Sequence, residues 1–217
     1  MQTNVLEPLG SESLANRIAD WLVDAIAGGI LEPGQRLIET EIAAALGVSR
    51  MPLREALKLL EAQGILAVTP RRGAAIVPFD AGRVQQICEA RLALERLALR
   101  DAAMRLRSEA DASSALDRLI GEMRQCTERG EWLTAVRADV EFHRQIVQAS
   151  GNPVVAMLWE ALARHVLIVF GREIRGERNS GLAEQHTRLR DILMEGSDAA
   201  LDGEIEHHIM RLQSAGR

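Results

Sequence analysis

The sequence predicts a mainly α-helical protein, with an N-terminal winged helix-turn-helix domain and a C-terminal all-α bundle of six helices. Three observations lead to this prediction. Five of the six prolines lie in the first 80 residues, and proline marks turns and helix ends. The remaining sequence is rich in Ala, Leu, Arg and Glu, which favour helices. Its apolar residues recur every three to four positions, as in helices that bury one face.

The 217 residues are enough for one or two domains with their own cores. We expect a tail over 1–10, a winged helix-turn-helix domain over 11–78 with its helix-turn-helix near 39–58, a linker over 79–82 and a helical domain over 83–217. Asn152 followed by Pro153 is typical of a helix N-terminus. The six helices of the second domain are expected at about 83–107, 109–128, 131–149, 153–172, 180–195 and 197–214.

Composition excludes several classes of protein. Hydrophobic residues make up 47% of the chain and charged residues 26%, which is ordinary for a globular protein and excludes collagen-like and disordered chains. No run approaches 18 apolar residues, and the N-terminus lacks a basic start followed by an apolar stretch. Two cysteines are too few for a disulfide framework. We therefore expect a cytoplasmic protein that does not associate with a membrane.

The first domain shows a recognisable order of elements. Apolar residues at helical spacing predict a first helix that ends at Gly28 and Gly29, and Gly47 ends a second helix over 39–46. Ser49 is placed to cap a third helix, and Pro52 is tolerated in its first turn. Two strands over 65–69 and 74–77 are joined by Pro-Arg-Arg-Gly, which predicts a hairpin. The helical repeat of the first helix is Leu14, Ile18, Leu22 and Ile26, and the second helix carries Ile42, Ala43 and Leu46 on one face. The third helix is expected to bury Leu53, Ala56, Leu57 and Leu60.

Basic residues gather in the same region, although the net charge of the chain is −5. Residues 50–72 hold five Lys and Arg against two Glu. Arg50, Arg54 and Lys58 are spaced to lie on one stripe of the third helix, where a recognition helix reaches base edges in the major groove. Arg71 and Arg72 lie at the hairpin tip, where a wing meets phosphate or the minor groove. A solvated cationic face is the alternative for any single arginine, but the whole motif favours DNA contact.

Titratable side chains interrupt three apolar stripes of the second domain. Asp139 and His143 fall on the stripe of the helix that starts near Trp132. His186 lies on the stripe of the helix over 180–195, and His208 on that of the last helix, whereas His207 lies about 100° away. A core histidine with one hydrogen bond, or a simple Asp–His pair, would explain each residue singly. Together they favour a site for Zn, Ni, Fe or Mn, because these metals accept imidazole and carboxylate ligands.

Arg91 and His165 also fall on apolar stripes. Arg91 either forms an internal ion pair with Glu95, four residues further on, or anchors the carboxylate of an effector through its planar guanidinium. His165 is expected to line an effector pocket, and a core histidine is favoured over a direct ligand. Trp132 and Trp159 are expected to pack in the core.

The stretch GVSR-x-P-x-REAL, followed by L-x-x-x-G and a wing that ends in Arg-Gly, resembles the DNA-binding domain of the GntR family of bacterial transcription regulators. The match spans most of residues 11–78. This resemblance implies that Arg50, Arg54 and Gly73 lie at the DNA surface. It also implies a homodimer that reads the two half-sites of a pseudo-palindromic double-stranded operator.

Residues 83–217 resemble the helical FCD sensor domain that one GntR subfamily carries. The resemblance rests on ICEARLALERLAL, ADVEFHRQIVQASGNP, EQHTRLRDILMEGSD and EIEHHIMRL. It implies that the metal ligands are Asp139, His143, His186 and His208. It further implies a small organic acid as effector, held by the metal and by Arg91.

We therefore expect a transcription regulator whose operator binding is controlled by a small carboxylate bound beside a divalent transition metal. Repression is expected rather than activation. A metal-free sensor and a regulator for which the ion itself is the signal are the alternatives. A His/Asp metallohydrolase fused to a DNA-binding domain is disfavoured, because Glu95 is the only inward acid left to act as a base and Arg91 neutralises it. We expect no enzyme activity.

Overall fold

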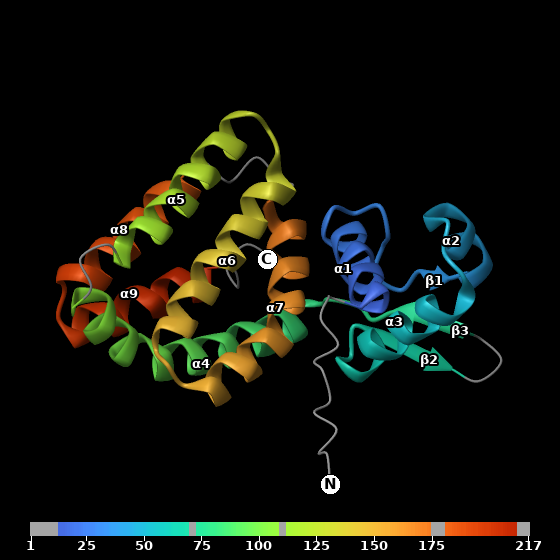
Figure 1. Ribbon diagram of the computed structural model, residues 1–217, viewed down its shortest axis with the longest axis horizontal. Coiled ribbons are helices and arrows are strands. Elements are labelled where there is room, and N and C mark those ends of the chain that lie inside the picture. The colour runs from blue at the N-terminus through green and yellow to red at the C-terminus, as the bar shows by residue number, and fades with distance from the viewer. Residues whose placement is uncertain (1–12, 70–72, 109–111, 175–180, 212–217) are drawn as a thin grey trace, which may run out of the picture. The chain divides into compact units, whose positions relative to one another are not determined.

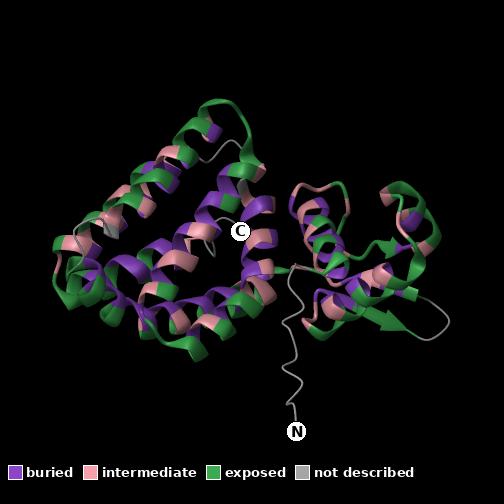
Figure 2. Cartoon of the chain, viewed as in Figure 1, coloured by how far each residue is buried: buried purple, intermediate pink, exposed green. Residues whose placement is uncertain are grey.

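The computed structural model describes residues 13–69, 73–108, 112–174 and 181–211 (Figure 1). Two compact units are present. The first comprises the described residues up to Leu22 together with Gln35–Val77, and the second comprises Val23–Gly34 and the described residues from Pro78 onward. Each unit has its own buried core, and the buried residues follow the inner faces of the helices (Figure 2).

Helices α1 (Leu14–Ala27), α2 (Glu39–Leu46) and α3 (Arg50–Ala62) are the three helices expected in the first part of the chain. Gly47 adopts a left-handed conformation, with φ of 63°, and its amide closes the last turn of α2, as a glycine without a Cβ can do at little cost. Ser49 occupies the N-cap position of α3, but its side chain makes no capping hydrogen bond, so the predicted side-chain cap is wrong. All four residues predicted to be buried by α3 are buried: Leu53, Ala56, Leu57 and Leu60.

A small antiparallel sheet of strand order β1-β3-β2 forms the wing. Strands β2 (Leu66–Thr69) and β3 (Gly73–Ile76) are the predicted hairpin, with Leu66 opposite Ile76 and Thr69 opposite Gly73. Strand β1 (Arg36–Leu37), which pairs with β3, was not predicted, because two residues carry no alternation of polar and apolar side chains. The hairpin tip, with Arg71 and Arg72, lies outside the described residues.

All six helices expected in the second part of the chain are present. They are α4 (Ala81–Ser108), α5 (Ala112–Glu128), α6 (Trp132–Ala149), α7 (Pro153–Ile174), α8 (Leu182–Glu195) and α9 (Asp198–Met210). The side chain of Asn152 accepts hydrogen bonds from the amides of Val154 and Val155 at 3.1 and 3.2 Å, which confirms the predicted cap of α7. Helix α4 begins at Ala81, within the residues expected to form a linker.

Helix α6 lies at the centre of the bundle and packs against α4, α5 and α7 (Figure 1). Helix α8 packs against α5 and α9, and α9 packs along α4. Arg96 of α4 binds Asp202 and Glu206 of α9 through its guanidinium, which ties these two helices together at the surface. One core unites the apolar faces of all six helices. Trp132 is 38% exposed, so its predicted place in this core is wrong, whereas Trp159 is fully buried.

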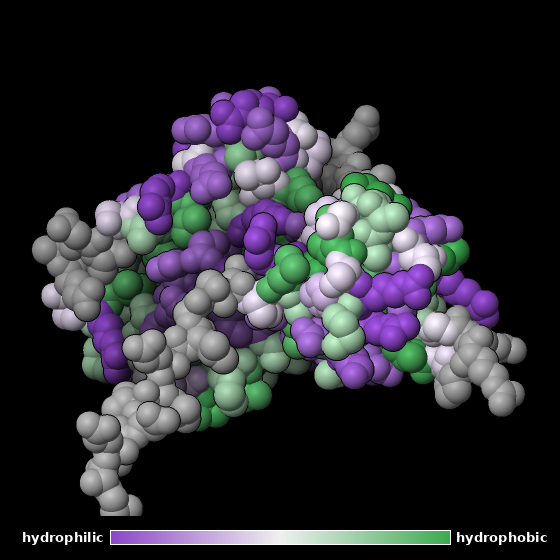
Figure 3. All heavy atoms as spheres, turned by 45° about the vertical axis from the view of Figure 1, so that its right-hand side comes forward, coloured by the Kyte–Doolittle hydropathy of each residue, from purple (hydrophilic) through white to green (hydrophobic). Residues whose placement is uncertain are grey.

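Among the described residues one helix, α7, is long and apolar enough over Pro153–Glu173 to cross a bilayer by length and composition alone. A core helix of a bundle passes the same test, and half of this stretch is buried against its neighbours. Hydrophilic and hydrophobic residues are interspersed over the face of the molecule in Figure 3.

Candidate metal centre and nucleic-acid interface

Helix α3 separates its basic and apolar residues onto different faces. Arg50, Arg54 and Lys58 are exposed, while the apolar face of the helix forms part of the core. The Nε atom of Arg54 donates to the carboxylate of Glu39 at 2.8 Å, so α2 orients the middle residue of the basic stripe. Gly73, the first residue of β3, has φ of 78°, a conformation that favours glycine. Helix α3 therefore exposes a stripe of basic residues, as helices that enter the major groove do.

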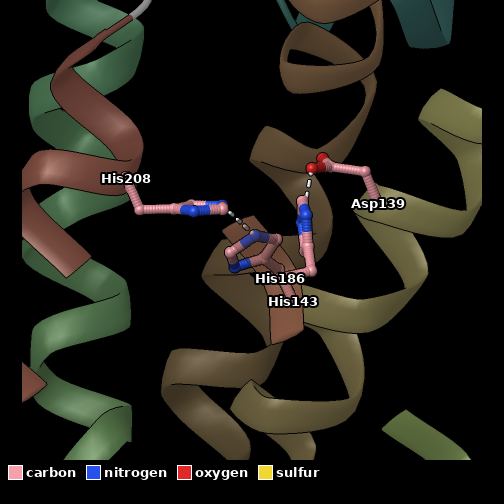
Figure 4. A group of neighbouring side chains, drawn as sticks. All are labelled: Asp139, His143, His186 and His208. Atoms are coloured by element: carbon pink, nitrogen blue, oxygen red, sulfur yellow. Dashed lines mark hydrogen bonds and ion pairs between the residues drawn. The ribbon is translucent and has the colours of Figure 1, made fainter. Parts of the chain in front are cut away.

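Three helices of the second unit bring four titratable side chains to one point (Figure 4). Asp139 and His143 lie one turn apart on α6, His186 projects from α8 and His208 from α9. One nitrogen or oxygen atom from each of the four lies within 4.8 Å of the others. All four residues are at most 1% exposed. Packing therefore brings side chains of α6, α8 and α9 together although these helices are far apart in the sequence.

Local packing explains why these side chains point inward. Asp139 and His143 share a face of α6 with Val136 and Val140, which are buried. The ring of Phe142 lies edge-on to His186, with 4.9 Å between centroids. On α9, His208 follows the buried face of Ile205 and Ile209, whereas His207 is exposed. The stripe that separates His208 from His207 is thus confirmed.

Hydrogen bonds to the outer ring nitrogens orient two of the imidazoles. The Nδ1 atom of His186 lies 2.8 Å from the carbonyl oxygen of Leu182, which can only accept, so Nδ1 carries the proton. The Nδ1 atom of His143 lies 2.7 Å from a carboxylate oxygen of Glu95. Both rings therefore turn an unprotonated Nε2 toward the cluster when they are neutral. This arrangement is the one that metal-binding histidines use.

Several inner atoms of the cluster have no hydrogen-bond partner among the described residues. They include both carboxylate oxygens of Asp139 and the Nε2 atom of His186, which are buried. The Nε2 atom of His186 lies 2.7 Å from one of those oxygens, which is within ion-pair distance. The two groups are not oriented for a hydrogen bond. Lone pairs that face each other so closely in a buried site need a proton or a cation between them. The donor set of three imidazoles and one carboxylate fits a divalent transition metal.

The protonation states agree with this donor set. Burial lowers the pKa of His143 and takes that of His208 well below its ordinary value, so both rings are neutral at pH 7. Burial alone would raise the pKa of Asp139, but the neighbouring His186, His143 and Arg91 outweigh it and hold that pKa far below its usual range. The carboxylate is therefore ionised, and the rings of His143 and His208 are free to act as ligands.

Arg91 and Glu95 form a buried ion pair on α4, with the Nε atom 2.7 Å from a carboxylate oxygen and both side chains 1% exposed. The guanidinium lies over the ring of Phe170, 4.9 Å from its centroid. Burial alone would lower the pKa of Arg91, but the negative charges of Glu95 and Asp139 outweigh it, and the pKa lies above its ordinary value. The two terminal nitrogens of Arg91 are buried and have no hydrogen-bond partner among the described residues.

His165 is buried on α7, but the structure does not bring it into the four-residue cluster. Its ring contacts Phe79, with 6.4 Å between centroids. This position is compatible with either predicted role, a pocket-lining residue or a core histidine.

Sequence reasoning missed the part that Glu95 and Arg211 play around the cluster. Glu95 bonds to His143 and to Trp159 as well as to Arg91. The Nε atom of Arg211, three residues after His208, is buried without a hydrogen-bond partner in the described chain. Burial lowers the pKa of Arg211, Asp139 opposes this effect and Arg91 adds to it. A stripe that continues one turn past His208 was the available signal for Arg211.

Both halves of the chain match known protein families. Residues 14–76 match the model of the family described as bacterial regulatory proteins, gntR family, and residues 86–211 match that of the FCD domain. The HTH-type transcriptional regulator YdhC of Bacillus subtilis is 31% identical over 84% of this chain and 82% of its own. The gluconate operon transcriptional repressor of Bacillus subtilis is 29% identical over 71% of this chain and 62% of its own.

The fold has a counterpart among solved structures. E. coli McbR/YncC superposes with a TM-score of 0.79 at 22% identity, over 94% of this chain and 98% of that one. At this identity the likeness shows the shared fold. The families matched along the chain are those of transcription regulators rather than enzymes. The chain therefore belongs to the GntR family of bacterial regulatory proteins and is a DNA-binding transcription regulator whose C-terminal part is an FCD domain.

Proposed function

We propose that this regulator is a cytoplasmic repressor, and that a small carboxylate bound beside a divalent metal ion in the FCD domain controls its binding to an operator. The observation that carries the proposal is the convergence of four buried ligand atoms within 4.8 Å, contributed by α6, α8 and α9. The relative named as a gluconate operon repressor supports the direction of regulation. We propose a homodimer that binds both halves of a pseudo-palindromic operator, because one such domain reads only a few base pairs.

In this proposal Asp139, His143, His186 and His208 hold Zn, Ni, Fe or Mn. The buried carboxylate of Asp139, which lacks a donor in the described chain, supports the need for a cation at this place. The ion supplies a positive charge and open coordination positions to an anionic ligand. The chain's own contribution is to hold three imidazoles and one carboxylate together at a site that the packed helices bury.

Arg91 provides the second point of attachment for the effector. Its Nε atom is used by Glu95, while its two terminal nitrogens remain buried and available. Two parallel N–H groups on one guanidinium match the two oxygens of a carboxylate. His165 and the buried Nε atom of Arg211 are the further candidates to line the effector site. The effector controls DNA binding only if it has different affinities for the DNA-competent and DNA-incompetent states.

Measurements of metal content and of operator affinity distinguish this proposal from two alternative modes of regulation. A metal-free sensor would use the three histidines directly on the effector, and a metal-responsive regulator would change its operator affinity with the ion alone. Purified protein, analysed for Zn, Ni, Fe and Mn, should contain about one equivalent per chain or take up one equivalent on titration. Content below about a tenth of an equivalent, with no uptake of added Zn or Ni, would remove the metal from the proposal. Operator affinity that follows the ion without any carboxylate would favour the metal-responsive alternative.

The DNA-binding surface is tested by Arg54→Ala, which removes the middle cation of the α3 stripe. Operator affinity should fall by about 1–3 kcal/mol, or roughly fivefold to 150-fold, because a paired hydrogen bond to a guanine edge is lost. Mobility shift with an operator fragment and with an unrelated duplex separates specific from general binding. Arg100→Ala, which removes an exposed arginine from α4 that is also paired with a carboxylate, is the control and should leave the affinity unchanged. Equal wild-type affinity for both duplexes would contradict sequence-specific reading.

A further inference from the structure

Glu95 is the point where the Arg91 ion pair and the histidine cluster meet. One carboxylate oxygen accepts from the Nε atom of Arg91 at 2.7 Å and from the indole Nε1 of Trp159 at 3.1 Å. The other oxygen lies 2.7 Å from the Nδ1 atom of His143. These contacts join α4, α6 and α7, and Glu95 is only 1% exposed. A buried acid with three donors around it is fully satisfied, and its position is therefore well determined.

We infer that Glu95 is a positioning residue, whose carboxylate fixes the His143 ring with an unprotonated Nε2 facing the cluster while it holds Arg91 in place. This inference rests on the proposed metal site and adds a residue that does not touch the metal. A carboxylate can only accept, so the neutral His143 ring must carry its proton on Nδ1. The lone pair of Nε2 is then directed inward at the position where Nε2 of His208 lies 3.1 Å away.

The surroundings of Glu95 support an ionised carboxylate. Arg91, a permanent cation, donates to it at 2.7 Å, and both side chains are buried, so no water competes for this contact from bulk solvent. Arg91 therefore acts on His143 through Glu95: the cation keeps the acid ionised, and the ionised acid fixes the imidazole. Partners of this kind orient metal-bound histidines and raise their basicity in many metal sites.

The substitution Glu95→Gln separates positioning from packing, because the two side chains have nearly the same shape. The single amide oxygen of the introduced glutamine faces one side only. That side is the one with two donors, of which Arg91 is a permanent cation. The NH2 group then faces Nδ1 of His143 and cannot accept its proton. The neutral ring should move its proton to Nε2, which removes the lone pair that a metal needs.

Two measurements test the inference. In the metal-free protein labelled with 15N-histidine, NMR correlation between ring nitrogens and carbon-bound protons reports which nitrogen carries the proton. The five histidines of the chain make the spectrum tractable, and a His143→Asn variant identifies the resonances of His143. The wild-type ring should carry the proton on Nδ1, and the ring in Glu95→Gln on Nε2. Zinc affinity, measured by competition with a chromophoric chelator, should fall about 10- to 100-fold in Glu95→Gln.

Glu204→Gln is the matched control. Glu204 is also buried, with its side chain 5% exposed, and it is also paired with an arginine, Arg188, at 2.8 Å. The same substitution there should leave zinc affinity within about threefold of wild type and the proton of His143 on Nδ1. An equal loss of zinc affinity in both variants would reduce Glu95 to a general contributor to stability and overturn the inference.

The outcomes also distinguish this inference from the proposed function. A wild-type protein that binds no zinc contradicts the metal site, whereas the proton position of His143 still tests Glu95. A wild-type protein that binds zinc, together with a Glu95→Gln protein that binds it equally well, contradicts the positioning role alone. Should Glu95→Gln fail to fold, the wild-type spectrum decides: a His143 ring protonated on Nε2 in the metal-free wild type would overturn the inference.

Discussion

Replacing His208 by alanine should empty the metal site, from about one equivalent of bound metal to less than about a tenth. A four-ligand zinc site is worth about 10–16 kcal/mol, so one ligand of four accounts for about 3 kcal/mol, or a loss in affinity of roughly 100-fold or more. His208 is 1% exposed, and its Nε2 atom lies 3.1 Å from that of His143. Elemental analysis and zinc titration of the purified variant provide the measurement.

The neighbouring His207→Ala variant is the control for this experiment. His207 is the preceding residue on α9, but it is exposed. Its removal should leave metal content and zinc affinity unchanged. Any loss of metal that is caused by purification, or by having one histidine fewer, would appear equally in both variants. Circular dichroism should confirm that both proteins keep their helices. A His208→Ala protein with full metal content, or a His207→Ala protein without metal, would contradict the face assignment of α9.

Replacing Arg91 by methionine should lower the free energy of unfolding by about 3–5 kcal/mol. The substitution leaves the buried carboxylate of Glu95 without its cation, and an uncompensated charge in the interior costs that much. Methionine approximates the length of the arginine stem, so lost packing contributes less than it would with alanine. The same variant should still bind the operator but lose any response to a carboxylate that releases the wild type. Urea unfolding and mobility shift measure the two effects separately.

Two further variants show whether charge is the cause. The double substitution Arg91→Met with Glu95→Gln removes the unpaired carboxylate and should unfold at a higher urea concentration than Arg91→Met alone. Arg96→Met removes a surface ion pair with Asp202 and Glu206 from the same helix and should cost only about 0–1 kcal/mol. A double variant that is less stable than Arg91→Met would show that packing, rather than the charge of Glu95, dominates at this position.

The local pattern of the chain was sufficient to predict which residues face inward. His208 and His207 differ only by one helical step, yet the apolar neighbours Ile205 and Ile209 place one inside and the other in water. The same logic correctly placed Asp139 and His143 on the buried face of α6 and the basic residues of α3 on its exposed face. Periodicity is less informative at helix ends. Trp132, the first residue of α6, lies on the predicted stripe but is 38% exposed.

Short or isolated features escaped the same reasoning. Strand β1 has only two residues and is defined by its pairing with β3, so it shows no alternation of polar and apolar residues from which it could be predicted. Ser49 has the side chain that a cap requires, but whether its hydroxyl meets an amide depends on the path of the preceding turn. Glu95 was recognisable as the partner of Arg91 from a spacing of four residues, but its bonds to His143 and Trp159 link residues 48 and 64 positions away.

The sequence by itself thus determined the order of the helices, the buried face of each and the identity of the side chains on that face. Those properties depend on neighbours three and four positions apart, which a linear pattern contains. Only the tertiary structure decided that α6, α8 and α9 place their polar residues within 4.8 Å of one another, and that Glu95 connects this cluster to Arg91. The distances between helices follow from how whole apolar faces interlock, a property that no single helix carries in its own sequence.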